Sequence, residues 1–461
     1  MGFPTLSIRH RSSLIQRMLC SSLLALLFLS LSSCYNRQDR EQILKVYNWA
    51  DYIDEDVLAE FPRWYEQQTG KKIKVIYQTF DINEVMLTKI ERGHEDYDVV
   101  CPSEYIIERM LRKDLLLPID TACFGRTPNY LHNISPYIIR QIDATSNHGR
   151  IAHRYAVPYM WGTCGILYNK TYVPQKDAET WGTLWNRLYQ GKLLMKDSYR
   201  DSYGTALIYA HRKDLAQGRI TVPQLMNDYS PEAIGTVEKY LSAMKPNIAG
   251  WEADFGKETM TKGKAWLNMT WSGDAVWAIE EAAKVGVQLD YEVPREGSNV
   301  WFDGWVIPKY SRNPKAAAFF INYLCQQHVA LANMETTGYV SSIAGPEVLK
   351  AMSDPETYPV AHDLSYFFGP EARRAHLNPI MYPDSMVVAR CAMIHDAGEH
   401  TAEVLDMWSK VKGDNLGGGI VIFLLAVVLA LTLFVGFKKI EHYKHRRLSR
   451  KHRRHHVIKV R

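Results

Sequence analysis

Side chains suited to holding a cation follow directly after two short apolar runs, residues 44–47 and 97–100. Such runs predict strands, and ligands of α/β proteins bind where strands of this kind end. Carboxylates pair with ammonium groups, while aromatic rings line methylene chains and attract ammonium groups to their faces. The chemistry therefore suits an organic cation. The candidate residues at these strand ends are Trp49, Asp51, Tyr52, Ser103 and Tyr105.

Each candidate also has a purely structural explanation. Most of the 12 Trp and 27 Tyr residues must pack in a core. Asp51 precedes an expected helix, and Ser103 stands where an N-cap would be. Clefts of acids and aromatic rings also bind sugars, and Asp51 with Asp303 would imitate the acid pair of a glycoside hydrolase. A hydrolase is therefore a distant alternative.

Motifs for catalysis and metal binding are missing from the sequence. It contains no G-x-S-x-G, no G-x-x-x-x-G-K-[ST] and no H-E-x-x-H. Outside the N-terminal region it has an odd number of cysteines and no C-x-x-C pair, which argues against a zinc knuckle. We expect a binding protein that is not an enzyme and needs no cofactor or metal.

Alternating strands and helices must position the candidate residues. Strand-like runs at 44–47, 73–77 and 97–100 alternate with helical patterns that begin near Asp54 and that cover residues 84–90 and 104–112. This order predicts a mostly parallel sheet. A body of this length is expected to form two lobes, with crossings at residues 155–158 and 305–308.

The N-terminus predicts export. Three arginines within the first 17 residues precede an apolar run over residues 23–29, which is too short to favour a membrane span. Small residues and Cys34 follow, as in a secretory signal peptide. The layout of residues 1–34 resembles a bacterial lipoprotein signal, in which Cys34 would be lipidated. An ordinary signal peptide with an incidental cysteine is the alternative.

The C-terminus predicts a membrane anchor. Residues 417–437 form an apolar stretch without a charged side chain, long enough to span a bilayer as a transmembrane helix. Residues 438–461 follow with 11 Lys/Arg and one Glu. By the positive-inside rule this basic tail is cytoplasmic, which places the body outside the cytoplasmic membrane.

Net charge separates the ends of the chain from its body. The chain totals +5, but the tail contributes +10 and the first 17 residues contribute +3, which leaves −8 for the rest. An acidic body attracts cations weakly and gives no reason to expect nucleic acid as a partner.

Six motifs, in sequence order over about residues 44–412, resemble the periplasmic putrescine/spermidine-binding proteins of ABC importers. No single motif is diagnostic, but their order along the whole body makes the resemblance specific. The motifs are VYNWADYI at 46–53, YQTFDINE at 77–84, YDVVCPS at 97–103, VPYMWG at 157–162, WFD at 301–303 and TGY at 337–339.

The resemblance implies a two-lobed α/β periplasmic-binding-protein fold of type II, to which the C-terminal transmembrane helix would be added. The implied first lobe comprises residues 44–155 with 304–346, and the second comprises residues 156–303 with 347–412. A polyamine would lie in the cleft between them. The implied ligand contacts are Trp49, Asp51, Tyr52, Ser103 and Tyr105 from the first set, and Asp201, Trp271, Asp274, Trp301, Asp303 and Tyr339 beyond it.

Several positions leave the choice of ligand open. The motif from Trp271 to Asp274 is similar to putrescine-type members of the family, whereas Tyr105 is closer to the spermidine type. Ser198 stands where spermidine-type members carry an acid, and the family's C-terminal Trp-Gln contact is replaced near Met393. The transmembrane tail is itself a departure from the familiar soluble members.

The expected function is that of a membrane-tethered substrate-binding subunit on the periplasmic face of the cytoplasmic membrane. It would deliver putrescine or spermidine to an ABC permease and its ATPase. A membrane-anchored polyamine sensor that signals to a partner protein is the alternative, and another cationic amine is an alternative ligand.

Overall fold

The computed structural model describes residues 39–413 except 148 and 254, and a few positions between 427 and 438. The chain divides into two compact units, residues 1–401 and 402–461. The sheet and the candidate site described below belong to the first unit, and all of α18 (Thr401–Gly413) except its first residue belongs to the second. Cys34 and the predicted signal peptide lie outside the described residues, as does the basic tail apart from Lys438.

The first part of the sheet is built as the sequence predicts. Strand β1 (Ile43–Trp49) pairs in parallel with β2 (Lys74–Phe80) and with β3 (Val99–Val100). Helices α2 (Glu55–Thr69), α3 (Asn83–Glu91) and α4 (Glu104–Arg112) connect or follow these strands. The predicted alternation is confirmed, and we call this part the first lobe.

Local chemistry fixes where α2 begins and ends. The Asp54 carboxylate accepts hydrogen bonds from the main-chain N–H groups of Asp56 and Val57, which would otherwise lack partners at the helix start. At the other end Gly70 takes a left-handed conformation with φ of 70°, which a residue without Cβ adopts at little cost. These two caps set the bounds of α2, which follows directly after the segment that carries Tyr52.

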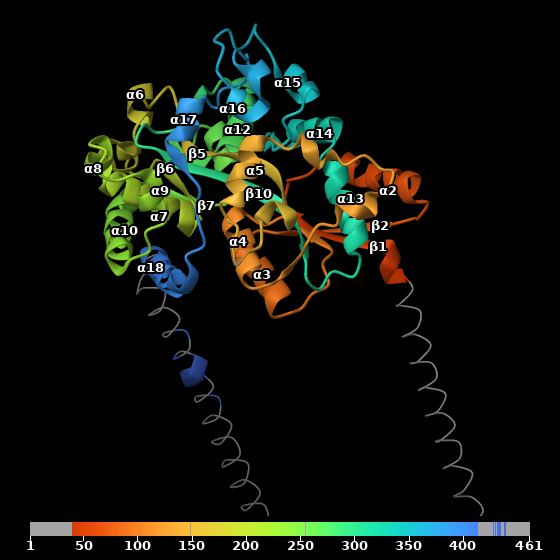
Figure 1. Cartoon of the computed structure of the whole chain (residues 1–461). Helices are drawn as coiled ribbons and strands as arrows, with labels where there is room; N and C mark the ends of the chain where they lie inside the picture. The colour runs from red at the N-terminus through yellow and green to blue at the C-terminus, as the bar shows by residue number, and fades with distance from the viewer. Residues whose placement is uncertain are drawn as a thin grey trace, which may run out of the picture. The chain divides into compact units, whose positions relative to one another are not determined.

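A second lobe continues the same sheet. Strand β8 (Leu267–Trp271) pairs antiparallel with β5 (Ala156–Asn169), and β6 (Leu193–Lys196) pairs in parallel with β8 and with β7 (Ile248–Glu252). Helices α7 (Tyr199–Ala210), α10 (Pro231–Met244) and α12 (Ser272–Lys284) belong to this part. Figure 1 shows α7, α8 (Arg212–Ala216), α9 (Val222–Met226) and α10 beside β6 and β7, and α2 and α13 (Pro314–Leu324) beside β1 and β2.

Two long strands join the lobes. Strands β5 (Ala156–Asn169) and β10 (Ser298–Pro308) are antiparallel neighbours, and every residue of both is buried. The sheet order is β2-β1-β3-β10-β5-β8-β6-β7. Strands buried on both faces read as continuous apolar runs, which is why residues 155–158 and 305–308 stood out in the sequence.

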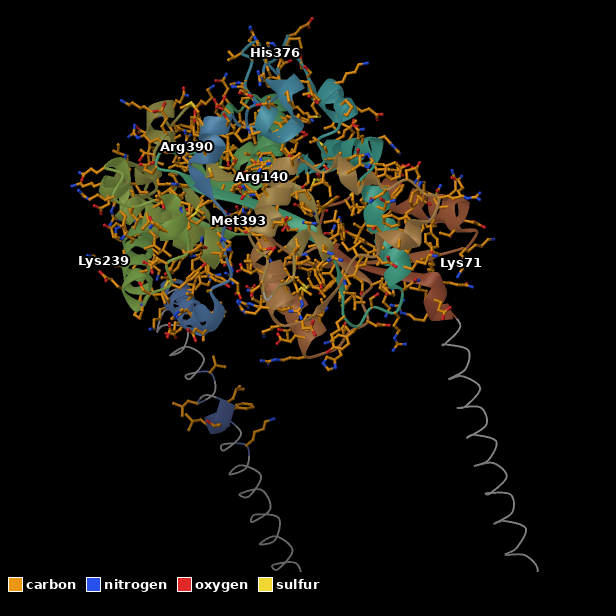
Figure 2. The ribbon with its side chains drawn as sticks, in the orientation of Figure 1. Lys71, Arg140, Lys239, His376, Arg390 and Met393 are labelled. Carbon is orange, nitrogen blue, oxygen red and sulfur yellow. The ribbon has the colours of Figure 1, made fainter. Side chains whose placement is uncertain are left out.

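The remaining elements are shorter or lie away from the candidate residues. Lys71 beyond α2 and Lys239 on α10 mark the outer faces of the two lobes in Figure 2. The strands are β4 (Leu116–Leu117), β9 (Leu289–Glu292), β11 (Val340–Ser341) and β12 (Cys391–Ala392), and the helices are α5 (Pro136–Asp143), α6 (Gln175–Ala178), α8 (Arg212–Ala216), α9 (Val222–Met226), α11 (Gly256–Thr261), α13 (Pro314–Leu324), α14 (Gln327–Thr337), α15 (Pro346–Met352), α16 (Ser365–Phe368), α17 (Ser385–Ala389) and α18 (Thr401–Gly413).

The predicted fold class needs one correction, at the C-terminus. We expected a transmembrane helix over residues 417–437. Within the part of the chain that the structure describes, however, no helix combines the length and apolar character needed to cross a bilayer. The expectation rested on apolar composition, whereas a span needs an unbroken helix of about 20 residues. In this segment the described helical positions are only 427, 429 and 431–434, and the others lie outside the described residues.

Candidate functional site

Asp303 is the centre of the first group of candidate residues. The Tyr52 hydroxyl donates a 2.8 Å hydrogen bond to Oδ2 of Asp303, and the Ser103 hydroxyl donates one of 2.7 Å to Oδ1. A β-bridge joins Ser103 to Asp303, and a bulge in β10 follows Asp303. Bulges re-aim side chains, and here three residues far apart in the sequence meet. Tyr52 and Ser103 come from the predicted strand ends.

Asp303 is a buried carboxylate without a cationic partner in the part of the chain that the structure describes. Only 7% of the residue is exposed, and it forms no ion pair with any described Lys, Arg or His. Burial raises its pKa to about 6, and the charge of Asp201 adds to this, while the hydrogen bonds from Ser103 and Tyr52 act in the opposite direction. A buried carboxylate of this kind is costly unless a cation pairs with it.

Two more carboxylates lie near Asp303. Asp201 on α7 accepts a 2.9 Å hydrogen bond from the Asn299 amide. Glu104, the first residue of α4, is 2% exposed, and its Oε2 has no hydrogen-bond partner among the described residues. Burial, and then the charge of Asp303, hold the pKa of Glu104 well above its ordinary value. Sequence reasoning missed Glu104 because an acid in the first turn of a helix is ordinarily solvated.

Asp274 is the centre of a second group, in the second lobe. The Tyr339 hydroxyl donates a 2.8 Å hydrogen bond to Oδ1 of Asp274, and the Lys196 ammonium lies 2.8 Å from Oδ2. Lys196 also pairs with Glu252 at 3.1 Å and lies 4.2 Å from the centre of the Trp271 ring. Burial would raise the pKa of Asp274, but Lys196 and Tyr339 outweigh it and the pKa falls below the ordinary value.

Aromatic rings connect the two groups. The Trp301 ring lies 6.5 Å from Trp271 and 5.6 Å from Tyr339, both in edge-to-face geometry. Tyr339 in turn meets Tyr52 edge to face at 5.1 Å. Trp301 is largely buried, and its Nε1 has no hydrogen-bond partner among the described residues. Rings in this arrangement form the apolar walls that a methylene chain needs.

Gly273 is tightly enclosed by the Tyr339 ring. A Cβ at this position would lie 2.3 Å from Cδ1 of Tyr339. We expect Gly273→Ala to push Tyr339 off Asp274 and to weaken ligand binding at least tenfold. The comparison is Gly235→Ala on α10, where a Cβ meets nothing within 4 Å. Isothermal titration of both variants checks this, and equal affinities would contradict it.

Three predicted contacts lie outside these two groups. Tyr105 receives a 2.8 Å hydrogen bond from Asn83, which also donates to Ser103. Trp49 packs on Phe80, and exposed Asp51 has a positive φ of 50°. Neither Trp49 nor Asp51 forms a hydrogen bond, ion pair or ring contact with another candidate residue in the described chain.

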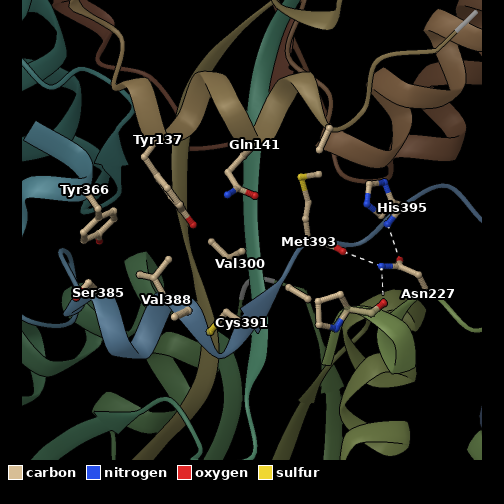
Figure 3. A pocket seen from close by; sticks show the side chains of 14 residues that line it. Tyr137, Gln141, Asn227, Val300, Tyr366, Ser385, Val388, Cys391, Met393 and His395 are labelled. Carbon is tan, nitrogen blue, oxygen red and sulfur yellow. Dashed lines mark hydrogen bonds between the residues drawn. The ribbon is translucent and has the colours of Figure 1, made fainter. Parts of the chain in front are cut away.

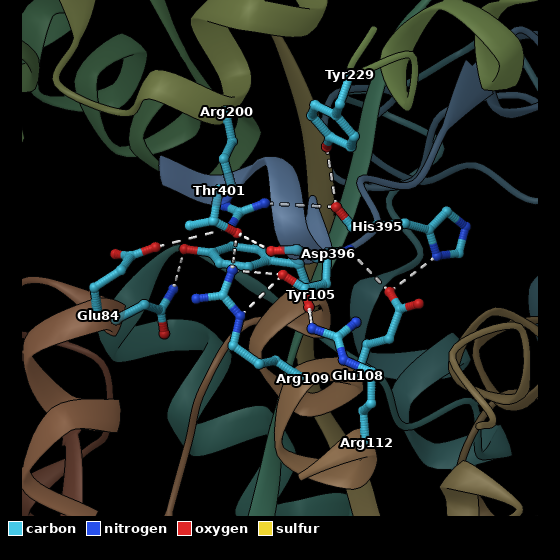
Figure 4. Close-up of polar contacts among 12 residues, drawn as sticks. Glu84, Tyr105, Glu108, Arg109, Arg112, Arg200, Tyr229, His395, Asp396 and Thr401 are labelled. Atoms are coloured by element: carbon cyan, nitrogen blue, oxygen red, sulfur yellow. Dashed lines mark hydrogen bonds and ion pairs between the residues drawn. The ribbon is translucent and has the colours of Figure 1, made fainter. Parts of the chain in front are cut away.

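Polar contacts join the lobes beside the candidate site. The Arg200 guanidinium on α7 stacks 3.6 Å from the centre of the Tyr105 ring on α4 and lies 3.9 Å from Glu84 on α3. The Tyr199 hydroxyl donates a 3.0 Å hydrogen bond to Glu84. Figure 4 shows Arg200 reaching from the second lobe toward these residues of the first.

A cavity of about 440 Å³ lies apart from the candidate residues. Its walls come from α5, α9, β10 and the segment from Ser385 to His395, and no predicted ligand contact lines it (Figure 3). We place the candidate site at Asp303 and Asp274 because the cavity wall lacks a carboxylate. Met393, near the expected replacement of the Trp-Gln contact, lines the cavity instead.

Comparisons with known proteins point to one family. A family model described as bacterial extracellular solute-binding protein matches residues 63–357. The spermidine/putrescine-binding periplasmic protein of Escherichia coli is 30% identical over 346 residues, covering 74% of this chain and 90% of that protein.

Two solved structures have the same fold. The spermidine/putrescine ABC transporter substrate-binding protein from Streptococcus pneumoniae has a TM-score of 0.59 at 30% identity, covering 80% of this chain and 98% of the other. A putative spermidine/putrescine ABC transporter protein from Listeria monocytogenes has a TM-score of 0.63 at 29% identity, covering 80% and 99%.

Proposed function

The chain belongs to the family of bacterial extracellular solute-binding proteins, and we propose that it is the substrate-binding component of an ABC importer for polyamines. Its relatives are named as binding proteins of transporters, so the chain is a binding protein and not an enzyme. It is expected to work in the periplasm, where the predicted signal peptide would direct it.

The observation that carries the proposal is Asp303. This carboxylate is buried, has no ion-pair partner among the described residues, and is oriented by the Tyr52 and Ser103 hydroxyls. An ammonium group of a ligand would supply the missing charge. The rings of Trp301, Trp271 and Tyr339 would cover the methylene chain that follows it. A polyamine has both parts.

Delivery to a permease would depend on the position of the lobes. β5 and β10 join the lobes, and Arg200 with Glu84 and Tyr105 links them beside the site. A ligand held between Asp303 and the second lobe would add to these contacts and favour the form that a permease recognises.

Binding is expected to weaken in acid. In the empty protein burial raises the pKa of Asp303 to about 6, and only the carboxylate pairs with an ammonium group. Above pH 7 the Asp303 carboxylate is ionised and can pair with a cation. Below pH 6 the carboxyl is protonated, and a ligand must displace this proton at a cost of up to tenfold in affinity per pH unit. Titrations at pH 7.5 and 5.0 check this, and an affinity independent of pH would contradict it.

Transport is tested in cells. Uptake of radiolabelled putrescine and spermidine is compared in a strain with the gene, a strain without it, and a strain complemented with Asp303→Asn. If the protein serves an importer, uptake is lost in the strain without the gene and in the strain complemented with Asp303→Asn. Normal uptake in all three, together with binding by the purified protein, would instead support the polyamine sensor.

A further inference from the structure

The place for a second cation is already filled by a side chain of the protein. Lys196 ends β6 and is 1% exposed. Its ammonium group contacts Asp274 at 2.8 Å, Glu252 at 3.1 Å and the carbonyl oxygen of Ala253 at 2.8 Å. Its hydrogen bonds to Asp274, to the Ala253 carbonyl and, at 3.4 Å, to Oε2 of Glu252 use all three N–H donors of a lysine. The Trp271 ring lies against the same ammonium at 4.2 Å.

Strand pairing holds Lys196 in this position. β6 and β7 are parallel neighbours, and Lys196 is the register partner of Glu252. Both side chains therefore leave the sheet at the same edge, next to the start of α12 where Asp274 lies. Glu252 also accepts a 3.1 Å hydrogen bond from the main-chain N–H of Gly256. The carboxylates and the aromatic face thus surround an ammonium group before any ligand arrives.

Because Lys196 neutralises only the carboxylates around Asp274, the two ends of the site differ in charge. At the first end Asp303, Asp201 and Glu104 are buried and have no ion pair with a described Lys, Arg or His. At the second end Asp274 and Glu252 share Lys196. A second ligand ammonium at Asp274 would meet a like charge in a medium that screens it poorly. Expelling Lys196 would break a buried ion pair.

We infer that Lys196 takes the place of one ligand ammonium, so that the end of the ligand facing the second lobe is uncharged. The ligand class is an aliphatic amine with its ammonium at Asp303 and a neutral group at the far end, as in a mono-acylated polyamine. This inference rests on the proposed function and narrows its substrate class.

Matched ligands test the inference on the full chain. Putrescine has two ammonium groups, and N-acetylputrescine keeps the same methylene chain with one. Calorimetric titration is expected to show that N-acetylputrescine binds at least tenfold more tightly. Putrescine binding as tightly or more tightly would overturn the inference while leaving the proposed function intact. If putrescine, spermidine, N-acetylputrescine and monoacetylated spermidine all fail to bind, the proposed function is contradicted instead.

Substitution of Lys196 provides a second test of the inference. Lys196→Met keeps the length of the side chain and removes its charge, and is expected to shift the preference toward putrescine at least tenfold. The matched control is Lys192→Met, because half-buried Lys192 lies 5.0 Å from the centre of the Trp266 ring but pairs with no site carboxylate among the described residues. An unaltered preference in folded Lys196→Met overturns the inference. If this variant does not fold, the ratio of the wild-type Kd values for putrescine and N-acetylputrescine decides.

Discussion

Asp303→Asn is expected to weaken amine binding by about thirtyfold or more. The substitution keeps the shape of the side chain and removes the charge that no described cation neutralises. Losing one partner of a buried, hydrogen-bonded charge pair costs about 2–5 kcal/mol, and 1.4 kcal/mol is tenfold in affinity. Titration calorimetry measures the loss. Asp290→Asn, which alters an exposed carboxylate paired with Lys170, should leave the affinity as it is.

Without ligand, the Asp303→Asn variant should be more stable than the wild type at pH 7. The pKa of Asp303 is raised to about 6 in the folded protein, above its unfolded value. Its contribution to stability is fully present below the unfolded pKa and is lost as pH rises through 6. At pH 7 the buried charge therefore costs on the order of 2–3 kcal/mol, at 1.36 kcal/mol per pKa unit. A higher Tm for Asp303→Asn without ligand is expected, and a lower Tm would contradict this account.

Asp396→Ala is expected to lower the free energy of unfolding by about 3 kcal/mol. The Asp396 side chain is fully buried and accepts a 2.9 Å hydrogen bond from Nε of Arg109. It also pairs with Arg112 (Figure 4). Removing it leaves the mostly buried Arg109 without its carboxylate, and breaking a buried pair from one side costs about 3–5 kcal/mol.

The loss of stability caused by Asp396→Ala should depend on pH. Burial alone would raise the pKa of Asp396, but Arg109 and Arg112 hold it below its ordinary value. The stability it contributes is present above the unfolded pKa and is lost as pH falls through the folded one. Urea unfolding at pH 7 and pH 3 should therefore show a smaller difference between variant and wild type in acid. Asp214→Ala removes an exposed partner of Arg219 and should unfold like the wild type.

The sequence predicts the strand–helix order of the first lobe and the residues at its strand ends, because both depend on local patterns. Tyr52 and Ser103 could be named as candidates for that reason. That they meet Asp303, 251 and 200 residues further along the chain, follows only from the resemblance to a known family, since register across a sheet is not a local property.

Glu104 and Lys196 could not have been found in this way. Glu104 looks like an acid in the first turn of an exposed helix, and Lys196 looks like a charge that ends a strand. Their burial results from the packing of one lobe against another and from the register that places Lys196 beside Glu252. The expected transmembrane helix was wrong for the part of the chain that the structure describes, where no helix is long and apolar enough to cross a bilayer.

The most direct test of a polyamine site centred on Asp303 is one calorimetric series. Wild-type protein and Asp303→Asn are titrated at pH 7.5 with putrescine, spermidine and their monoacetylated forms. We predict that at least one of these amines binds the wild type with a Kd of about 1 μM or tighter, near −8 kcal/mol, and that the variant loses this binding. Binding of none of them, or equal binding by the variant, would contradict the account.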